Sequence, residues 1–600
     1  MNGAYNVRYL GALTDLNSGA DTAISFQGTF TFDGKGGFTV AGQGTSAGAA
    51  LKFQTTGQYT VLSSGMVEIN NPFDPIAANS TVIFGGVGAS GIIVGSSTDS
   101  FNLEDIFVAV PGTAAASATT LSGNYRVVGL EFLNGDFQST RNSFFPMTSN
   151  GSGSLGNLTI SGTAQSLSNK AATQTSNGAT YTLTANGTGT LVIPTPSGVT
   201  APNTLISGTK TMYVSPDGSF FVAGSPTGYD IEVGVKTGGA TALDGLYFEA
   251  NLNNFVGGSN PIAVAGAQGS ATENAYHGSP AGVEIGHERT QPDDSFAFDF
   301  TFSDNFVFGS DGTTGTASTF SVYAIGANGG IAIGSGLSTN YLLDIYVKAP
   351  TMTAPAGTTV FLNPQGVVNG ASFVPVTAQV APGEIITMFG TGLGPATPVT
   401  ASAPFPNTLG GVQVLINNTP APAYFVSATQ VSAVVPYTAP NDGSFLNIQV
   451  VNNGAQSNTV TVYSGVTSPG MFMLPTTATL FSGAIVHPAD GSIVTAANPA
   501  KVGETVSLFL TGLGAVTGNV AAGSAAPSSP LSTITAPDFF VLFDDTQIQG
   551  NVLFAGLAPG FAGLYQVNVT IPQGVTKGSQ ISVWFETDDA LNVVATIPIG

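Results

Sequence analysis

The sequence is 600 residues long, which exceeds one ordinary domain, and 42% of its residues are hydrophobic whereas only 8% are charged. Its formal net charge of −22, with 12 basic residues, leaves no basic face for a nucleic acid or an anionic membrane surface. The absence of cysteine excludes disulfides and cysteine-based metal sites or nucleophiles. No apolar run reaches the roughly 18 residues of a membrane span. Frequent glycine, threonine and aromatic residues predict an all-β fold with almost no helix.

The first part of the chain contains three copies of one pattern. Each copy opens with Gly, any residue and Tyr, at Tyr5, Tyr125 and Tyr247. Each closes with an acidic residue, Ile or Val, any residue and Val, starting at Asp105, Glu232 and Asp344. Because both markers recur in the same order, we interpret the copies as homologous β-rich modules. Their predicted bounds are 1–120, 121–242 and 243–362, and the third is the most diverged.

A second repeated stretch lies further on: "GEIITMFGTGLG" from Gly383 to Gly394 and "GETVSLFLTGLG" from Gly503 to Gly514. Both faces of this stretch are largely apolar, which is typical of a central strand. We expect the glycines after it to turn the chain and Leu393 to close the end of the core. The surrounding short alternating segments predict two immunoglobulin-like sandwiches over 363–466 and 467–600. The predicted fold class is therefore all-β, with tandem β-sandwich or Ig-like modules.

The segment "VVNGASFVPVTAQVAPGEIITMFGTGLGP", with "FAGLAPGFAGLYQVNVTIP" downstream, resembles the uncharacterised C-terminal domain of large secreted acidobacterial proteins. It is also similar to the wider group of IPT/TIG domains, which are immunoglobulin-like, without their DNA contacts. The likeness covers 363–600, and the modules before it look like the tandem β-rich repeats of such proteins. The resemblance implies an extracellular or cell-surface protein whose signal peptide, not visible at Met1, has been removed. It supplies no activity and no catalytic residue.

A transition-metal site is the first chemistry that the sequence allows. Histidines and acids gather in "HGSPAGVEIGHER", where the metal candidates are His277, Glu284 and His287. Their spacing matches no helical metal motif, so a polar loop of the third module is the favoured interpretation. Calcium is the one cofactor considered, because carboxylates are hard oxygen ligands. The acidic pairs that could bind it are Asp293-Asp294, Asp544-Asp545 and Asp588-Asp589.

No catalytic or cofactor-binding residue is assigned, and we expect the protein not to be an enzyme. "GTSAG" from Gly44 to Gly48 matches the nucleophile-elbow pattern, but no histidine lies in that module. A strand lysine beside an amide and an acid can form an intramolecular isopeptide crosslink, for which we consider Lys52, Lys236 and Lys348. Ordinary edge charge is the favoured interpretation of these lysines.

Sparse positive charge is the feature from which we predict a function. β-Proteins protect their edge strands with charge, above all lysine, and 12 basic residues are few for five modules. We predict an extracellular structural protein whose partner is itself, and whose modules assemble into a filament, sheath or surface array by inter-subunit strand addition. The predicted donors lie in the first and last strands, at Gly3, Tyr5, Val7, Leu591, Val593 and Ile597.

The alternative is a cell-surface adhesin or carbohydrate-binding protein that has surface glycans as partners. Its expected signature is a cluster of exposed aromatic side chains on one face. Glycan sites favour tryptophan, and Trp584 is the only tryptophan of the chain. The composition therefore favours assembly over glycan binding.

Overall fold

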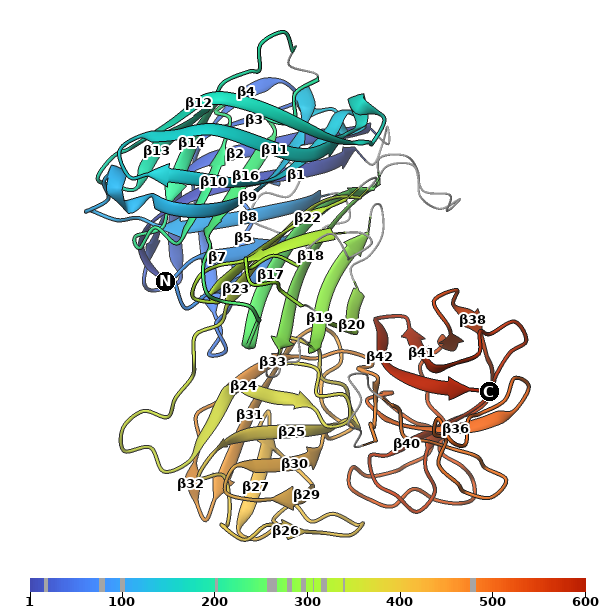
Figure 1. Cartoon of the computed structure of the whole chain (residues 1–600). Coiled ribbons are helices and arrows are strands. Elements are labelled where there is room, and N and C mark those ends of the chain that lie inside the picture. Colours follow the sequence, from blue (N-terminus) through green and yellow to red (C-terminus); the bar gives the residue numbers. More distant parts are fainter. Residues whose placement is uncertain are drawn as a thin grey trace.

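The computed structural model describes residues 1–15, 20–74, 81–97, 103–199, 203–255, 267–277, 283–292, 298–305, 307–314, 321–337, 340–474 and 482–600. In these residues the regular elements are strands, apart from four single-turn 3-10 helices: η1 (Ala118–Thr120), η2 (Leu133–Gly135), η3 (Phe137–Ser139) and η4 (Gln165–Leu167). The prediction of an all-β chain with almost no helix is confirmed. No helix in these ranges is long and apolar enough to cross a membrane. Figure 1 shows two barrels packed side by side, an open sheet next to them, and two further units toward the C-terminus.

The first two modules are closed antiparallel barrels of eight strands each. In each barrel the last strand returns to pair with the first, with Pro111 opposite Tyr5 in the first barrel and Asp230 opposite Glu131 in the second. The prediction of sandwiches was wrong for these modules. Apolar and polar residues alternate in the same way in both architectures, and only long-range pairing closes a barrel.

The strands of the first barrel are β1 (Asn2–Asp15), β2 (Ala20–Asp33), β3 (Gly37–Ser46), β4 (Ala49–Val61), β5 (Met66–Asn70), β6 (Val82–Val87), β7 (Ile93–Ser96) and β8 (Leu103–Pro111). Those of the second are β9 (Ser122–Phe132), β10 (Thr140–Asn150), β11 (Ser154–Ala164), β12 (Ala171–Leu183), β13 (Thr188–Ile193), β14 (Gly208–Val214), β15 (Phe220–Gly224) and β16 (Asp230–Lys236).

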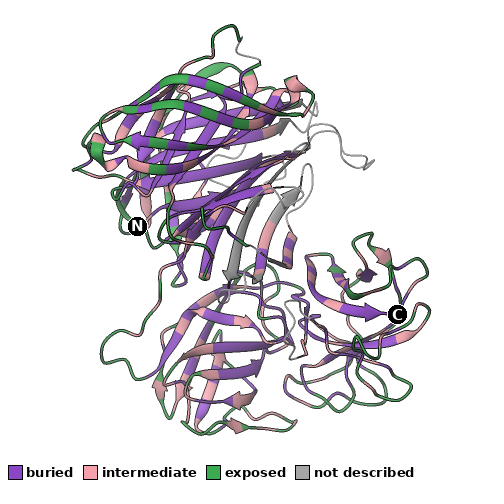
Figure 2. Cartoon of the chain, in the orientation of Figure 1, coloured by how far each residue is buried: buried purple, intermediate pink, exposed green. Residues whose placement is uncertain are grey.

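The two barrels pack as one body. Aromatic side chains fill the first barrel, where the rings of Phe26 and Phe73 lie 4.7 Å apart. Val108 of β8 and Val233 of β16 are fully buried and belong to an apolar core outside either barrel interior. The closing strands are therefore buried on both faces, which Figure 2 shows as continuous purple arrows between the barrels. Burial of apolar area on this scale is the dominant stabilising term for such packing.

The third module is an open sheet. Its strands are β17 (Gly245–Phe255), β18 (Ala267–His277), β19 (Val283–Pro292), β20 (Phe298–Asn305), β21 (Ser321–Ile325), β22 (Ile331–Gly336) and β23 (Asn340–Lys348). Strand β20 pairs in parallel with the last strand of the chain, β42 (Ala590–Ile599), from Asp299 opposite Ala590 to Thr301 opposite Asn592 (Figure 1). An 11-stranded sheet therefore runs from the third module into the last unit.

The chain ends in two units of two facing sheets each. The first unit packs the sheet β24-β25-β30-β29-β26 against β28-β27-β31-β32, with β33 beside β31. The second packs β34-β36-β40-β39, with β35 beside β36, against the β42-β41-β37-β38 end of the 11-stranded sheet. These two units keep the sandwich arrangement that alternating short strands predict.

The strands of the first of these units are β24 (Phe361–Asn369), β25 (Ile385–Thr391), β26 (Val399–Thr400), β27 (Val412–Ile416), β28 (Thr419–Ala421), β29 (Ala423–Val426), β30 (Gln430–Val434), β31 (Phe445–Asn452), β32 (Ala455–Gln456) and β33 (Val460–Tyr463). Those of the second, before β42, are β34 (Gly470–Met471), β35 (Ile485–Val486), β36 (Thr505–Thr511), β37 (Phe539–Phe543), β38 (Ile548–Gln549), β39 (Asn551–Leu557), β40 (Tyr565–Thr570) and β41 (Gly578–Thr587).

The repeated glycine-rich stretch forms β25 and β36, and each has strand neighbours on both sides. Gly383 and Gly503, just before these strands, have φ values of 78° and 84°, a conformation that glycine adopts without strain. Leu393 and Leu513 follow the strands and are both 0% exposed. The predictions of a central strand and of a leucine that closes the core are confirmed.

The acids that close the three modules are buried inside them. The Tyr9 hydroxyl donates to Asp105 Oδ2 at 2.8 Å, and the Tyr323 hydroxyl donates to Asp344 Oδ2 at 2.8 Å. Burial raises the pKa of both aspartates to about 6. In the second module the equivalent residue, Glu232, faces a lysine instead of a tyrosine.

Candidate functional site

A cleft of about 650 Å³ lies where four parts of the chain meet. Strands β5 and β6 of the first barrel form one side, and β19 and β20 of the third module form another. The ends of β31 and β33, loop residues at 377, 379, 441–444 and 464–466, and Asp589 of the last unit also line the cleft. The site therefore exists only when these parts are packed together.

Aromatic side chains form one wall of the cleft. The Tyr463 ring lies 5.5 Å from Phe445 and 6.1 Å from Phe84, and the Arg289 guanidinium lies 5.6 Å over Phe84. The Tyr463 hydroxyl donates to Glu68 Oε1 at 2.8 Å, which ties β33 to β5. Burial and the neighbouring Glu68 carboxylate raise the pKa of Tyr463 well above its ordinary value. Phe445 is 37% exposed, so the wall offers an apolar face to a ligand.

Polar side chains of β19 and β20 also line the cleft. His287 Nδ1 is 3.0 Å from Thr377 Oγ1, and its Nε2 is 3.4 Å from Asp299 Oδ2. Arg289 Nη1 is 3.4 Å from Asp299 Oδ1. Burial alone would raise the pKa of Asp299, but His287 and Arg289 outweigh it and hold that pKa below its usual range. The buried carboxylate is therefore charged and joins β19 to β20.

Asp589 fixes the last unit against the unit before it, which contains β24 to β33. Its Oδ2 accepts the N–H groups of Val466 at 2.7 Å and Thr467 at 3.2 Å, and the Gln379 amide at 2.8 Å. Its Oδ1 accepts the Thr467 hydroxyl at 2.8 Å. Protein donors thus surround both oxygens of this member of the Asp588-Asp589 pair, for which the sequence had left calcium open. Hydrogen bonds to an ionised carboxylate are among the stronger ones in proteins.

The charge of the cleft is negative. Among the described residues of the lining, the carboxylates belong to Glu68, Asp299, Asp442 and Asp589, and Arg289 is the one arginine or lysine. An anionic ligand would be repelled, whereas hydroxyl groups can donate to carboxylates such as that of the exposed Asp442. The combination of an apolar face with a few convergent polar groups is typical of a small-molecule site.

The predicted metal residues do not form a described ligand set. The backbones of His277 and Glu284 lie opposite each other across β18 and β19, but their side chains lie outside the described residues. His287 contacts Thr377 and Asp299, as given above. Across the described parts of the chain, no group of three or more His, Cys, Asp or Glu residues could hold a metal ion. The pair 293–294 lies outside the described residues.

The predicted strand donors are paired within the chain. In β1, Gly3 is opposite Phe32 of β2, while Tyr5 and Val7 have partners in both β2 and β8. In β42, Leu591 is opposite Glu586 on one side and Phe300 on the other, and Ile597 is opposite Ile581. Val593 lies where the pairing of β42 with β41 shifts register. Donation of either strand to another subunit would require these pairs to open.

Sequence reasoning missed most of the cleft. Arg289, Asp299 and Tyr463 are isolated residues in ordinary strands, and no spacing pattern connects them. Two residues of the lining gave a signal: Asp589 as half of an acidic pair, and His287 as a metal candidate. Glu68 and Tyr463 are 395 residues apart in the chain, and only the packing of distant modules brings them together.

Comparison with known proteins identifies one domain. Residues 371–464 match the IPT/TIG domain family. This range falls within the first of the two predicted Ig-like units, 363–466. No curated protein matches the chain. One solved structure that matches is a protein of unknown function from the DUF3598 family of Nostoc punctiforme, 9% identical over 58% of this chain and 96% of that chain. Its TM-score is 0.13, so this likeness carries no inference about the chain.

Proposed function

We propose that this chain, an all-β protein with an IPT/TIG domain at 371–464, is a non-enzymatic extracellular protein that binds a neutral saccharide in the cleft between its modules. The observation that carries the proposal is the cleft of about 650 Å³, which combines an exposed aromatic face with convergent carboxylates. We therefore favour carbohydrate binding, the alternative drawn from the sequence, over assembly through the terminal strands. Those strands are already paired within the chain.

The lining of the cleft determines the class of ligand. Phe445 and Tyr463 offer flat apolar surfaces on which the C–H face of a sugar ring can lie. The exposed Asp442 carboxylate can accept hydrogen bonds from sugar hydroxyls, and the partly exposed Arg289 guanidinium can donate to them. The excess of carboxylates disfavours phosphorylated or sulfated sugars. A neutral oligosaccharide fits both features.

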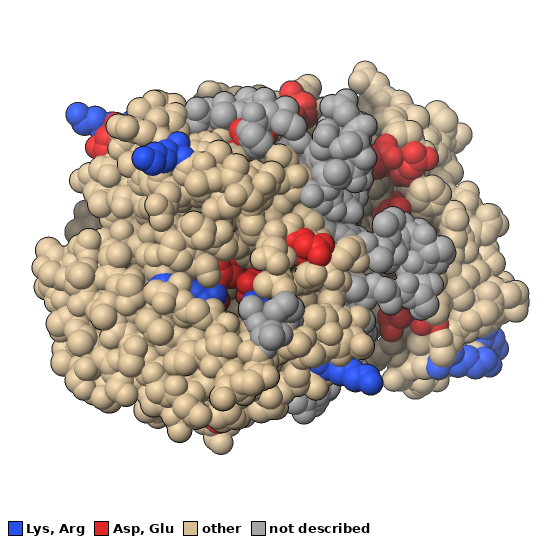
Figure 3. All heavy atoms as spheres, turned by 90° about the horizontal axis from the view of Figure 1, so that it is seen from above, with Lys and Arg blue, Asp and Glu red and all other residues tan. Residues whose placement is uncertain are grey.

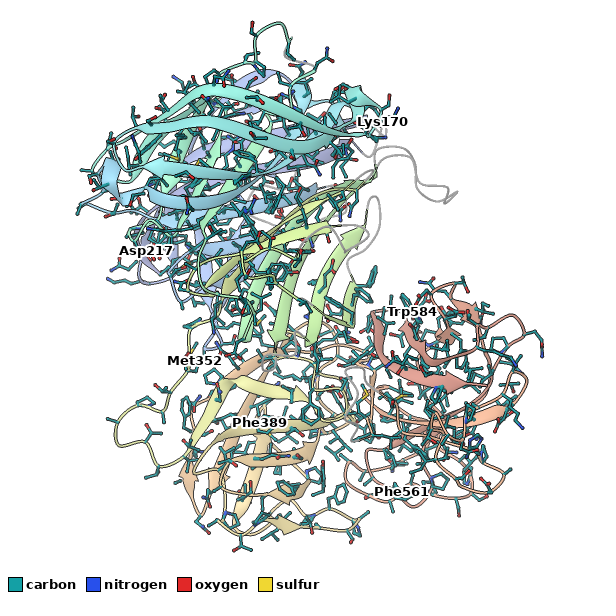
Figure 4. The ribbon with its side chains drawn as sticks, in the orientation of Figure 1. Lys170, Asp217, Met352, Phe389, Phe561 and Trp584 are labelled. Carbon is teal, nitrogen blue, oxygen red and sulfur yellow. The ribbon has the colours of Figure 1, made fainter. Side chains whose placement is uncertain are left out.

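A glycan array with the full-length protein tests this proposal. We expect binding to a defined set of neutral glycans and a loss of at least about tenfold in affinity for Phe445→Ala. Phe561→Ala is the matched control, because Phe561 is 58% exposed and lies at the far end of the last unit from the third module (Figure 4). Equal losses in the two variants, or no glycan binding, would contradict the proposal. Cleavage of a bound glycan would contradict its non-enzymatic part.

Assembly into a filament or surface array remains a second candidate because one edge strand exposes a large apolar side chain. Leu553 of β39 is 60% exposed at a register shift, and β39 pairs with β40 along one side. Thr533 bridges the other side only near its end, at Gly556. Charged side chains normally protect such edges. On the face of the molecule seen from above, they are few and scattered over a mostly uncharged surface (Figure 3).

Electron microscopy of the purified protein tests this second candidate. If β39 mediates assembly, the wild-type protein forms ordered polymers and Leu553→Lys reduces them to single particles, since lysine guards edges. Leu531→Lys is the matched control, because Leu531 is 45% exposed and lies outside any strand. Single particles of the wild-type protein at high concentration would count against assembly.

A further inference from the structure

A buried charge cluster lies inside the second barrel, where the first barrel docks on it. Its centre consists of Lys210 on β14 and Asp230 and Glu232 on β16, whose side chains are 1%, 0% and 2% exposed. Lys210 Nζ contacts Asp230 Oδ2 directly and lies 3.1 Å from Glu232 Oε1. Met212 and Phe221 belong to the apolar interior of the same barrel. An amine and two carboxyl groups thus meet in a site without water access.

The Asp230 carboxyl group is held in one orientation by donors on each oxygen. Its Oδ1 accepts the Ser225 N–H at 2.8 Å and Arg8 Nη2 at 3.2 Å. Its Oδ2 accepts the Ser225 hydroxyl at 2.8 Å and faces Lys210. Two donors directed at Oδ1 would stabilise negative charge on that atom. One oxygen is therefore placed to accept charge, and the other lies beside the amine.

We propose that Lys210 and Asp230 condense to an intramolecular isopeptide bond, with Glu232 as the proton relay. One proton moves from the Lys210 ammonium to Oδ2, and Nζ then forms a bond to Cγ while the C=O electron pair moves to Oδ1. Nζ passes a second proton to the neutral Glu232 carboxyl, which gives its own proton to the Oδ2 hydroxyl. That hydroxyl leaves as water when the electron pair on Oδ1 restores the C=O bond. An ammonium and a carboxylate become an amide and one water, so atoms and charge balance without a co-reactant.

The environment of Glu232 suits a relay. Burial, helped by the carboxylates of Asp230 and Glu131, raises the pKa of Glu232 to about 8 against the attraction of Lys210. The side chain is therefore mainly neutral at pH 7 and can both donate and accept a proton. Within the described residues, Glu232 Oε2 has no hydrogen-bond partner. Amide formation also removes two buried charges, whose desolvation is costly.

Arg8 makes the site depend on both barrels. It extends from β1 of the first barrel, and its Nε donates to the Asp230 carbonyl at 2.9 Å. A side chain at Gly224 would overlap this guanidinium, so a glycine there leaves room for it. The donors on Oδ1 are complete only after the barrels dock. The bond would then fix β14 to β16 beside the interface between the barrels.

Tryptic digestion and mass spectrometry of the full-length protein test the bond. Lys210 is the only trypsin site between Lys170 and Lys236. Because trypsin does not cleave after an acylated lysine, we expect an undivided 171–236 peptide that is lighter by one water. Separate peptides 171–210 and 211–236 at full mass would overturn the proposal. Formation of a succinimide at Asp217-Gly218 would also make the peptide lighter by one water. Trypsin would still cleave after Lys210 in that case, so the two products are distinguished by whether the 171–236 peptide stays undivided.

Two variants separate the role of Glu232 from that of the cluster as a whole. We expect Glu232→Gln to slow bond formation by at least about 100-fold, a typical contribution of acid–base catalysis. Glu586→Gln is the matched control, because Glu586 is an exposed residue of β41 in the last unit, outside the second barrel, and the bond should persist. Full bonding in Glu232→Gln would overturn the relay. Fragment ions that join Lys210 to Glu232 would overturn Asp230 as the acceptor.

Discussion

Truncation of the leucine that follows each repeated strand should destabilise its own unit. Leu393 and Leu513 are 0% exposed, and an alanine at either position would leave a cavity where three carbons had been. The backbone cannot collapse into that space, because Leu393 donates its N–H to the Ala428 carbonyl at 3.0 Å and its Cδ2 lies close to Gly390. Fully buried Leu→Ala changes cost about 3 kcal/mol in such sites.

Hydrogen exchange in the full-length protein measures this cost locally, which avoids treating several units as one two-state transition. We expect Leu393→Ala to speed exchange about 100-fold in β25 and β30 but not in β36, since 1.4 kcal/mol is a factor of ten. Leu513→Ala should give the reverse pattern. Leu531→Ala, at a residue that is 45% exposed, should change neither. Equal loss of protection in both units after either change would refute the assignment of one leucine to one core.

Two further predictions concern the markers of the repeated modules. Burial raises the pKa of Asp105 from 3.8 to about 6, so the stability that this residue contributes is full below pH 3.8 and is lost as pH rises through 6. Asp105→Asn should remove this pH dependence from the thermal midpoints measured between pH 4 and 7. A slope equal to that of the wild type would contradict this. Tyr125→Phe removes the hydrogen bond of 2.6 Å to the buried Gly218 carbonyl, and we expect the second barrel to lose about 1 kcal/mol of stability. Hydrogen exchange in β9 measures this loss, and unchanged exchange there would show that the bond adds no stability.

Most of the secondary structure of this chain is predictable because it depends on neighbours in the sequence. The markers at Tyr125 and Glu232 delimit the second module, and the structure places them in the first and last strands of one barrel. The stretch around Ile385, apolar on both of its faces, identifies a central strand without any tertiary information. Such patterns reflect a period of two along each strand, which the chain carries locally.

The closure of the sheets was not predictable in the same way. A barrel and a sandwich use the same alternation, and the pairing of Pro111 with Tyr5 is a contact between the two ends of a module. The parallel pairing of Phe300 with Leu591 joins residues from different modules, and no local pattern marks it. It occupies a strand that the sequence had made a candidate for pairing between subunits.

The sequence by itself determined an acidic, cysteine-free, all-β chain with repeated modules, because composition and periodicity are local properties. Only the tertiary structure decided which residues meet: Glu68 with Tyr463 in the cleft, and Lys210 with Asp230 inside a barrel. These contacts depend on how whole modules close and dock. Closure and docking bury apolar faces that look alike in sequence. Chemistry needs side chains within a few ångströms of each other, and in this protein that proximity is a property of the assembled chain.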